Sequence, residues 1–327
     1  MNMIRNAAPS APDLDVGARD QALVQLGRRL QADRYRFVSV TPLTQQRNNA
    51  RDSSRLARDV RDVFGWNRPF EDGLLPAAEL TSLLEHGVLR AHDGLWASQV
   101  RWSSLGELLL VHSSYPTQAH DAVFFGPDTY RFAQAIEEHL RSSLAPITRA
   151  VDIGCGSGAG AILIARARRE AQVLAVDINP TALRYTAVNA ALAEVSNVSA
   201  WHSDILQGTS DDFDLIVANP PYMQDPLQRA YRHGGEGLGS ALSVRIVGEA
   251  LQRLRIGGSL LLYTGAPMIA GVDVFLEQAR KLFDGVPGWA WSYREVDPDV
   301  FGEELETPEY AQAERIAAVV LTVTRTG

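Results

Sequence analysis

The segment "DLIVANPPYM", at positions 214–223, ends an apolar run with an amide, two prolines and a phenol. Pro220 and Pro221 fix the backbone twice and remove two N–H donors. The Asn219 side chain and the Pro220 backbone each offer a carbonyl oxygen to an N–H donor, and the flat ring of Tyr222 can stack on a plane. These residues therefore indicate either a plain rigid turn after a strand or a rigid platform for a planar substrate.

A glycine-rich turn in "AVDIGCGSGAGAILIARA", at positions 150–167, is the second candidate for chemistry. Gly154, Gly156 and Gly158 permit positive φ and a close approach of the backbone to a ligand. The helix that follows adds a favourable dipole end. Asp177 ends the next predicted strand, where an acid can accept both hydroxyls of a ribose. The turn and the acid together suit a nucleotide-containing cofactor, a dinucleotide among them.

Strands and helices alternate from about Ile147 onward, which is typical of a parallel α/β sheet. The predicted strands are 150–153, 172–177, 198–202, 214–219 and 259–263, and the helices between them are 160–169, 180–194, 240–254 and 272–283. Two further strands, 291–296 and 316–324, lack a strong helix between them, so we expect an antiparallel pair at one edge. This places both candidate sites at the carboxyl ends of parallel strands, where ligands bind.

The first third of the chain has a different character. We expect residues 1–18 to be a mobile tail, because they are rich in Ala, Pro and Asp. A helical pattern runs from Asp20 to Phe64, followed by a short helix that ends near Gly87. The turn Asp93-Gly94 then joins strands 88–91 and 95–102, and a third strand is expected over 108–112. The predicted domains are a smaller helical and β-hairpin domain over 19–119 and a sheet domain over 120–327.

Five arginines recur every three or four residues between Thr41 and Trp66, and this spacing places several of them on one helix face: Arg47, Arg51, Arg55, Arg58 and Arg61. Asp52, Asp59 and Asp62 offset three of the charges, which favours a solvated face. The alternative is a surface for an anionic partner.

Composition narrows the function classes. The 327 residues are 46% hydrophobic and carry a net charge of −8, which suits two globular domains and gives no strongly basic footprint for nucleic acid. The single cysteine, Cys155, excludes an internal disulfide and lies in the glycine turn without a visible activating partner. No secretory signal or membrane-spanning run is visible, so we expect a cytoplasmic protein. We expect no metal site.

Asp152 gives the glycine turn a more specific reading. The order Asp152-Ile153 and then Gly-x-Gly-x-Gly resembles motif I of the class I S-adenosylmethionine (SAM) methyltransferases. The resemblance implies a Rossmann-like class I methyltransferase sheet in which this loop wraps the methionine part of SAM. It also implies that Asp177, with Ile178 beside it, binds at the ribose, and that Asp204 and Ile205 of "WHSDIL" contact adenine.

In that family, Asn-Pro-Pro-Tyr marks enzymes that methylate nitrogen on planar groups: a glutamine amide, adenine N6 or guanine N2. The resemblance therefore implies catalytic roles for Asn219, Pro220 and Tyr222, with Asn219 also close to the cofactor. Catalysis would rest on orientation and proximity, with the sulfonium as the driving force.

More of the chain is similar to one branch, the HemK-like release-factor glutamine methyltransferases. In "FFGPDTYRFAQAI", Pro127-Asp128-Thr129 matches a Pro-x-Thr element, and Thr129 is expected to border SAM. "YRHGGEGLGSALSVRIV" is similar to the glycine-containing segment after the tetrapeptide. The resemblance covers roughly 123–262. Gly126 and Tyr130 depart from the charged residues usual around Pro-x-Thr.

The favoured function is N-methylation of a planar amide or amine, glutamine-like, on a protein or a small molecule. One alternative keeps SAM but lets its amine attack its own Cγ, which releases methylthioadenosine and forms azetidine-2-carboxylate; Asp152 and Asn219 would lie near that amine, and Phe124, Phe125 or Tyr130 could close an apolar box around it. A second alternative is a nucleic-acid base methyltransferase, which the net acidity disfavours. A non-catalytic or dinucleotide-binding domain is a minor option.

Overall fold

The computed structural model describes residues 17–143, 145–210, 212–225 and 231–327. Most of the tail predicted over 1–18 lies outside these residues, and Ala18 already begins a helix.

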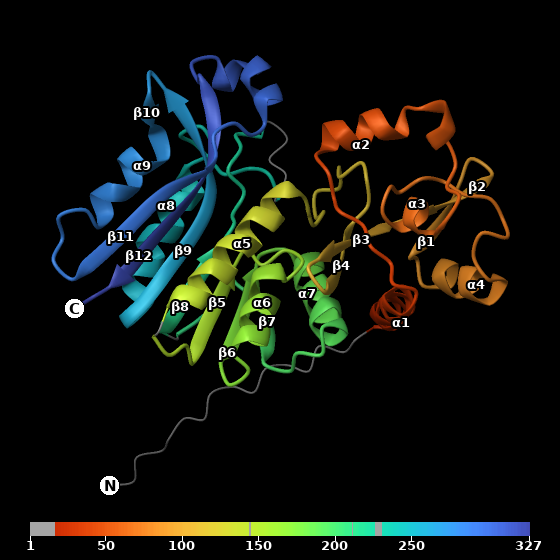
Figure 1. Ribbon diagram of the computed structural model, residues 1–327, viewed down its shortest axis with the longest axis horizontal. Helices are drawn as coiled ribbons and strands as arrows, with labels where there is room; N and C mark the ends of the chain where they lie inside the picture. Colours follow the sequence, from red (N-terminus) through yellow and green to blue (C-terminus); the bar gives the residue numbers. More distant parts are fainter. Residues whose placement is uncertain (1–16, 144, 211, 226–230) are drawn as a thin grey trace, which may run out of the picture.

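A twisted sheet forms the C-terminal part, with the strand order β11-β12-β9-β8-β5-β6-β7 (Figure 1). The strands are β5 (Arg149–Ile153), β6 (Gln172–Asp177), β7 (Val198–His202), β8 (Phe213–Ala218), β9 (Leu254–Ile269), β10 (Val272–Asp273), β11 (Trp289–Asp297) and β12 (Arg315–Arg325). The first five run parallel, and β12 runs antiparallel to both β9 and β11. The mostly parallel sheet with an antiparallel pair at one edge is confirmed. The strand predicted over 259–263 is longer than expected, since β9 also pairs with β10 and the far end of β12.

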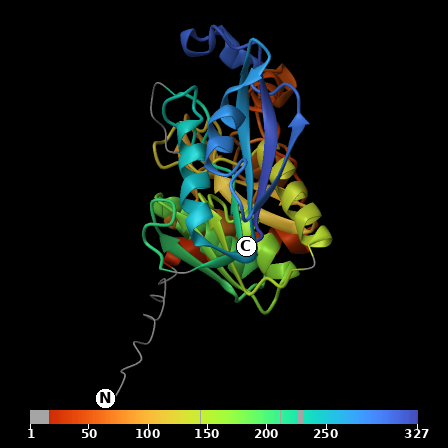
Figure 2. The ribbon, with the colours of Figure 1, turned by 90° about the vertical axis from the view of Figure 1, so that its left-hand side faces the viewer.

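Helices cover both faces of this sheet (Figure 2). They are α5 (Pro127–Ser142), α6 (Ala159–Ala167), α7 (Pro180–Leu192), α8 (Ala241–Arg253) and α9 (Val274–Ala279), with 3-10 turns η2 (Arg280–Leu282), η3 (Gly302–Glu306) and η4 (Pro308–Tyr310). Alternate residues of β8 enter opposite cores: Leu215 packs with α5 and α6, whereas Ile216 packs with α8 and α9. Burial on both faces explains why the parallel strands read as continuous apolar runs.

The N-terminal part contains short elements: α1 (Ala18–Ala32), α2 (Pro42–Asn49), η1 (Asp52–Ser54), α3 (Val60–Phe64), α4 (Ala77–Glu85), β1 (Leu89–His92), β2 (Leu95–Ser98), β3 (Val100–Leu105) and β4 (Leu108–Ser113). The hairpin at Asp93-Gly94 is confirmed, with φ of 51° and 77° at these residues. The strand predicted over 95–102 is wrong in one respect. It breaks at Gln99 into β2 and β3, and β3 pairs with β4 as a second hairpin.

The prediction of an arginine face is also wrong. Thr41 caps α2 as expected, but the helix ends at Asn49, and the five arginines fall in α2, around η1 and in α3. Local contacts explain the break: Arg55 pairs with Asp52 at 2.8 Å, and Asp59 caps α3 instead of continuing a helix. The arginines therefore form no single stripe.

The N-terminal part packs on α7. Its apolar core includes Ala182, Tyr185, Val188 and Leu192 of that helix. The Asn189 side chain accepts a hydrogen bond from the backbone N–H of Val111 on β4, and it donates to the carbonyls of Val111 and Ser157. Because Ser157 belongs to the glycine turn, one buried amide connects the N-terminal hairpin to the candidate site. No helix in the described ranges is long and apolar enough to cross a membrane.

Candidate active site

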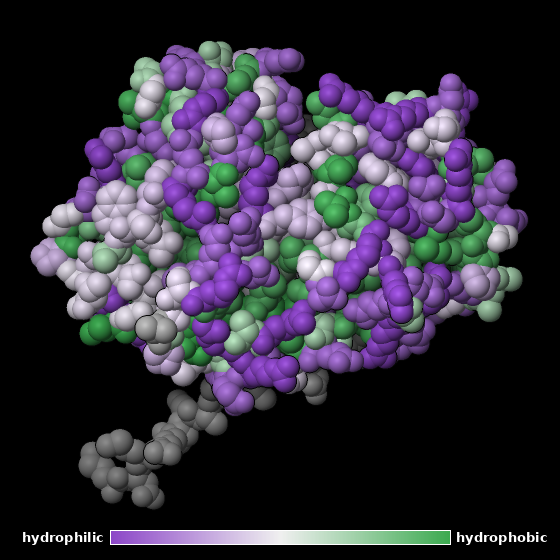
Figure 3. Space-filling model, in the orientation of Figure 1, coloured by the Kyte–Doolittle hydropathy of each residue, from purple (hydrophilic) through white to green (hydrophobic). Residues whose placement is uncertain are grey.

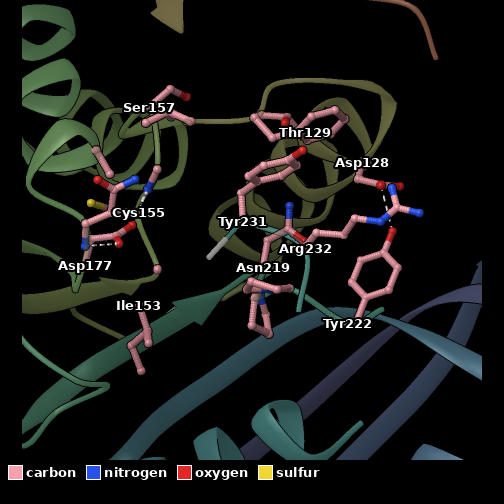
Figure 4. A pocket seen from close by; sticks show the side chains of 18 of the residues that line it. Asp128, Thr129, Ile153, Cys155, Ser157, Asp177, Asn219, Tyr222, Tyr231 and Arg232 are labelled. Carbon is pink, nitrogen blue, oxygen red and sulfur yellow. Dashed lines mark hydrogen bonds between the residues drawn. The ribbon is translucent and has the colours of Figure 1, made fainter. Parts of the chain in front are cut away.

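A pocket lies at the carboxyl ends of β5, β6 and β8, where the sequence places both candidate sites (Figure 4). Eleven of the twelve predicted site residues line it: Thr129, Asp152, Gly154, Gly156, Asp177, Ile178, Asp204, Ile205, Asn219, Pro220 and Tyr222. Gly158 does not. The fold thus brings together residues that lie up to about 90 positions apart in the chain, because parallel strands end at one edge of a sheet.

The glycine turn has the expected backbone. Gly154 and Gly156 have φ of 67° and 54°, and the N–H groups of Gly154 and Cys155 both donate to the carbonyl of Val176 on β6. Gly158, with φ of 78°, faces away from the pocket, and a Cβ there would lie 2.9 Å from the Thr186 side chain. Its role as a ligand contact is therefore not supported by its position. Gly158 allows α6 to pack closely on α7.

Replacing Gly158 with alanine is expected to lower the free energy of unfolding by about 1–3 kcal/mol, because it combines left-handed backbone with the contact to Thr186. The matched control is Gly154→Ala, which has a similar φ but open space around the added Cβ. Urea unfolding of both variants measures the difference. Equal losses at the two positions would remove the packing role of Gly158.

The Asp177 carboxylate holds the turn from the end of β6. It accepts the Gly156 N–H at 3.0 Å and the Asn179 N–H at 2.9 Å (Figure 4). Burial raises the Asp177 pKa, and these N–H donors oppose the shift. The next side chain, Ile178, is 53% exposed and lines the pocket. An acid beside an uncovered apolar side chain suits a ribose joined to an adenine.

Asp152 is 1% exposed at the end of β5, and its Oδ2 accepts the Ala161 N–H of α6 at 2.9 Å. Burial raises its pKa from 3.8 to about 7. The carboxylate is therefore poised to bind a cationic group, since a neighbouring positive charge would restore its ionisation.

The substitution Asp152→Asn tests whether the buried carboxylate charge destabilises the folded protein. Because the folded pKa is raised, the folded protein binds a proton that the unfolded chain releases, so stability falls as pH rises from about 4 to about 7. The asparagine keeps the acceptor for Ala161 and carries no charge. At pH 8 the cofactor-free variant should be more stable than the wild-type protein by up to about 4 kcal/mol. Near pH 4 the two should unfold alike. Chemical unfolding at both pH values measures this, and a gain that is the same at both would contradict it.

The two residues expected to contact adenine, Asp204 and Ile205, differ in whether other side chains already bind them. Ile205 is buried, with φ of 50°, and forms an apolar part of the wall. Asp204 pairs with Arg245 of α8 at 2.8 Å, at a half-exposed position. A polar contact from Asp204 to a ligand would therefore share the carboxylate with Arg245, a partner that sequence reasoning missed.

The tetrapeptide follows β8, as predicted. The Asn219 side chain makes no hydrogen bond to any residue that the structure describes, and it lines the pocket beside Pro220. Tyr222 lies differently from the expectation. Its ring is 6% exposed and packs closely on Gly265 of β9, so it is part of the wall and not a free stacking surface.

Asp128 anchors Tyr222 and was not predicted as a site residue. Its carboxylate accepts the Tyr222 hydroxyl at 2.7 Å (Figure 4). It also accepts the Tyr263 hydroxyl at 2.7 Å and pairs with Arg131, which binds Asp297 at 2.6 Å. Burial, then the Asp128 charge, raises the Tyr222 pKa, so the phenol remains a donor. The sequence feature that could have identified Asp128 as a site residue is its position as the middle residue of the Pro-x-Thr element. This network ties the tetrapeptide to α5.

Two other aromatic rings border the pocket. Phe124 and Tyr231 are nearly parallel, with ring centroids 6.2 Å apart, and the Tyr231 hydroxyl donates to the Thr117 carbonyl at 2.6 Å. Figure 4 shows Tyr231 close to Asn219. Tyr231 is thus an aromatic residue of the pocket lining that sequence reasoning missed.

The apolar box suggested for the cyclase alternative is only partly present. Phe124 lines the pocket, but Phe125 stacks on His112 and Tyr130 accepts the Ser39 N–H at 2.9 Å, both outside the pocket lining. Cys155 is buried against Thr186, and burial raises its pKa well above the usual value, so it is not a nucleophile.

Comparison with known proteins decides the family of this region. Residues 119–270 match the family model of the methyltransferase small domain. They form a methyltransferase domain. The release factor glutamine methyltransferase of Rhodopirellula baltica is 37% identical over 168 residues, which are 46% of this chain and 56% of that protein. The ribosomal protein uL3 glutamine methyltransferase of Xanthomonas campestris is 36% identical over 132 residues, which are 36% of this chain and 42% of that protein.

These relatives support a class I SAM methyltransferase of the HemK-like branch for this region. The chain spans little more than half the length of the first of them. Among solved structures, the tRNA m1G37 methyltransferase of M. jannaschii superposes with a TM-score of 0.47 at 17% identity, over 70% of this chain and 57% of that chain.

Proposed function

We propose that the protein is a SAM-dependent N-methyltransferase that acts on a planar amide nitrogen of the glutamine side-chain type. The observation that carries the proposal is the Asn219 amide, which has no hydrogen-bond partner among the described residues and lines the same pocket as the glycine turn and Asp177. Both relatives described above are glutamine methyltransferases, which supports the acceptor class.

The residues present fit SAM by their chemistry. Asp177 would hold the ribose, with Ile178 and Ile205 against the adenine. Asp152 offers a carboxylate whose raised pKa a cationic amine would relieve. Gly154 and Gly156 provide the close backbone approach, and Thr129 borders the methionine end from α5.

When bound, SAM supplies an electrophilic methyl group on a sulfonium. The chain's own residues orient the acceptor. The Asn219 side-chain carbonyl and the Pro220 backbone carbonyl accept the two N–H bonds of the amide, which fixes its plane. Pro220 and Pro221 keep these acceptors rigid, and Asp128 holds Tyr222 beneath them. Tyr231, whose ring also lines the pocket, would offer a flat surface to the amide. Orientation of this kind accounts for the rate.

We further propose that residues 19–119 and 120–327 are separate domains and that the first recognises the acceptor, a protein or a small molecule. Their contact supports this role, because Pro42 of α2 lines the pocket although it belongs to the N-terminal part. The family model matches residues 119–270 and none of 19–118, so the acceptor can differ from that of the relatives.

The test is mass spectrometry of what SAM becomes with the purified full chain, alone and with glutamine-containing peptides, free glutamine or an RNA oligonucleotide. S-adenosylhomocysteine together with a methylated glutamine amide is the expected result. Methylthioadenosine formed from SAM alone would instead establish the cyclase alternative. Transfer to the oligonucleotide only would establish base methylation.

A further inference from the structure

A polar cluster is buried between β3, β4 and the start of α5, next to the pocket but outside its lining. Arg101 donates from Nη2 to the Ser39 hydroxyl, which pairs with Ser103 at 2.7 Å. Ser103 in turn lies 2.8 Å from Nε2 of His112. The Ser39 N–H donates to the hydroxyl of Tyr130. These groups come from β3, β4, α5 and the segment before α2, and Arg101 is the cation among them.

The guanidinium of Arg101 is only partly satisfied. The residue is 5% exposed, its Nε is buried without an acceptor, and Ser39 is its one hydrogen-bond partner among the described residues. No described carboxylate pairs with it. A guanidinium has five N–H donors, so most of its capacity is unused.

The neighbours carry no compensating charge. Burial, then the Arg101 charge, lowers the His112 pKa, so this imidazole is neutral. Burial raises the pKa of Tyr130 and of Tyr115, so both phenols stay protonated. Burial also lowers the Arg101 pKa, but only to about 10, so the side chain is charged at neutral pH. A buried cation without an anion is costly, and an anionic ligand would offset that cost.

One nitrogen of this cation is not fully enclosed, and Tyr115 lies near enough to Arg101 for the two side chains to interact electrostatically. Nη1 of Arg101 has no described acceptor and is not among the fully buried atoms. Tyr115 is half-buried, and its hydroxyl reaches the Pro42 carbonyl at 3.5 Å. Pro42 itself lines the pocket. Figure 3 shows the surface hollowed between α2 and the segment of η3 and η4.

We propose that Arg101 and Tyr115 form a carboxylate-binding site beside the pocket mouth. A planar guanidinium binds the two oxygens of a carboxylate side by side. The Tyr115 hydroxyl, which now donates to the Pro42 carbonyl over 3.5 Å, can turn to donate its proton to the same carboxylate. The carboxylate belongs either to the acceptor, next to its amide, or to the methionine end of the cofactor. The identity of the molecule that carries the carboxylate rests on the proposed function. The existence of the anion site does not depend on that function.

The test measures thermal unfolding of the cofactor-free full chain in sodium acetate and in sodium chloride of equal ionic strength. With acetate roughly tenfold above its Kd, the wild-type Tm should be about 2–4 °C higher than in chloride. Arg101→Gln should show no such shift, while Arg90→Gln, an exposed arginine of β1, should behave like the wild-type protein. Tyr115→Phe keeps the charge and should reduce the shift, so the test holds even if Arg101→Gln folds poorly.

Titration with S-adenosylhomocysteine distinguishes the sources. A loss of affinity of more than about tenfold in Arg101→Gln would assign the site to the cofactor carboxylate, and unchanged affinity with a lost acetate shift would assign it to the acceptor. The site is ruled out if acetate fails to raise the wild-type Tm, or raises it equally in Arg101→Gln or Tyr115→Phe. Neither measurement requires methyl transfer, so both can still be interpreted if the protein proves not to be a methyltransferase.

Discussion

Asn219→Ala is expected to lower kcat for methyl transfer by roughly 10²–10³-fold, the size of effect seen when one positioning hydrogen bond is lost from an active site. The side chain has no partner among the described residues, so its loss should leave the Tm within about 1 °C of the wild-type value. It should also leave the affinity for S-adenosylhomocysteine within about threefold. Steady-state kinetics with a glutamine-containing acceptor, together with calorimetric titration, measures these quantities.

Asn219→Asp is the matched variant, because it keeps an acceptor oxygen at the same position. It should recover part of the lost rate if acceptance of an N–H bond is what Asn219 contributes. A different pattern, in which alanine abolishes cofactor binding and leaves the rate at saturating SAM unchanged, would show that Asn219 holds the cofactor and not the acceptor.

Asp128→Asn is expected to lower both stability and rate. The carboxylate accepts two phenol hydroxyls and pairs with Arg131, and an amide can accept on one side only. Hydrogen bonds to a buried charge are strong, so we expect a loss of about 2–4 kcal/mol in the free energy of unfolding. Because Tyr222 would lose its anchor, kcat should fall at least about tenfold, with a smaller change in KM for SAM.

Two further variants separate the network from charge removal in general. Asp33→Asn removes an exposed acid that pairs with Arg29 at 3.0 Å, and it should cost no more than about 1 kcal/mol. Tyr222→Phe removes one of the two phenols and should give an intermediate loss of rate. If Asp128→Asn lowered stability while kcat stayed at the wild-type value, the network would serve the fold alone.

The sequence by itself determined the sheet domain and most of its site. The strands 172–177 and 198–202 agree residue by residue with β6 and β7. The glycine turn, Asp177 and the tetrapeptide lie where the local pattern placed them. These features depend on short-range physics: alternation of strand and helix, positive φ at glycine, and the shared edge at which parallel strands end.

Only the tertiary structure decided which way several side chains face. Tyr222 lies against Gly265 and donates to Asp128, a residue 94 positions away, while Tyr231 lies near Asn219 instead. Arg101 is buried with no carboxylate partner in the described part of the chain, although its segment has the sequence pattern of an ordinary strand. Partners that distant in the chain meet only after the elements have packed, and burial, which sets their charges and pKa values, exists only in the folded protein.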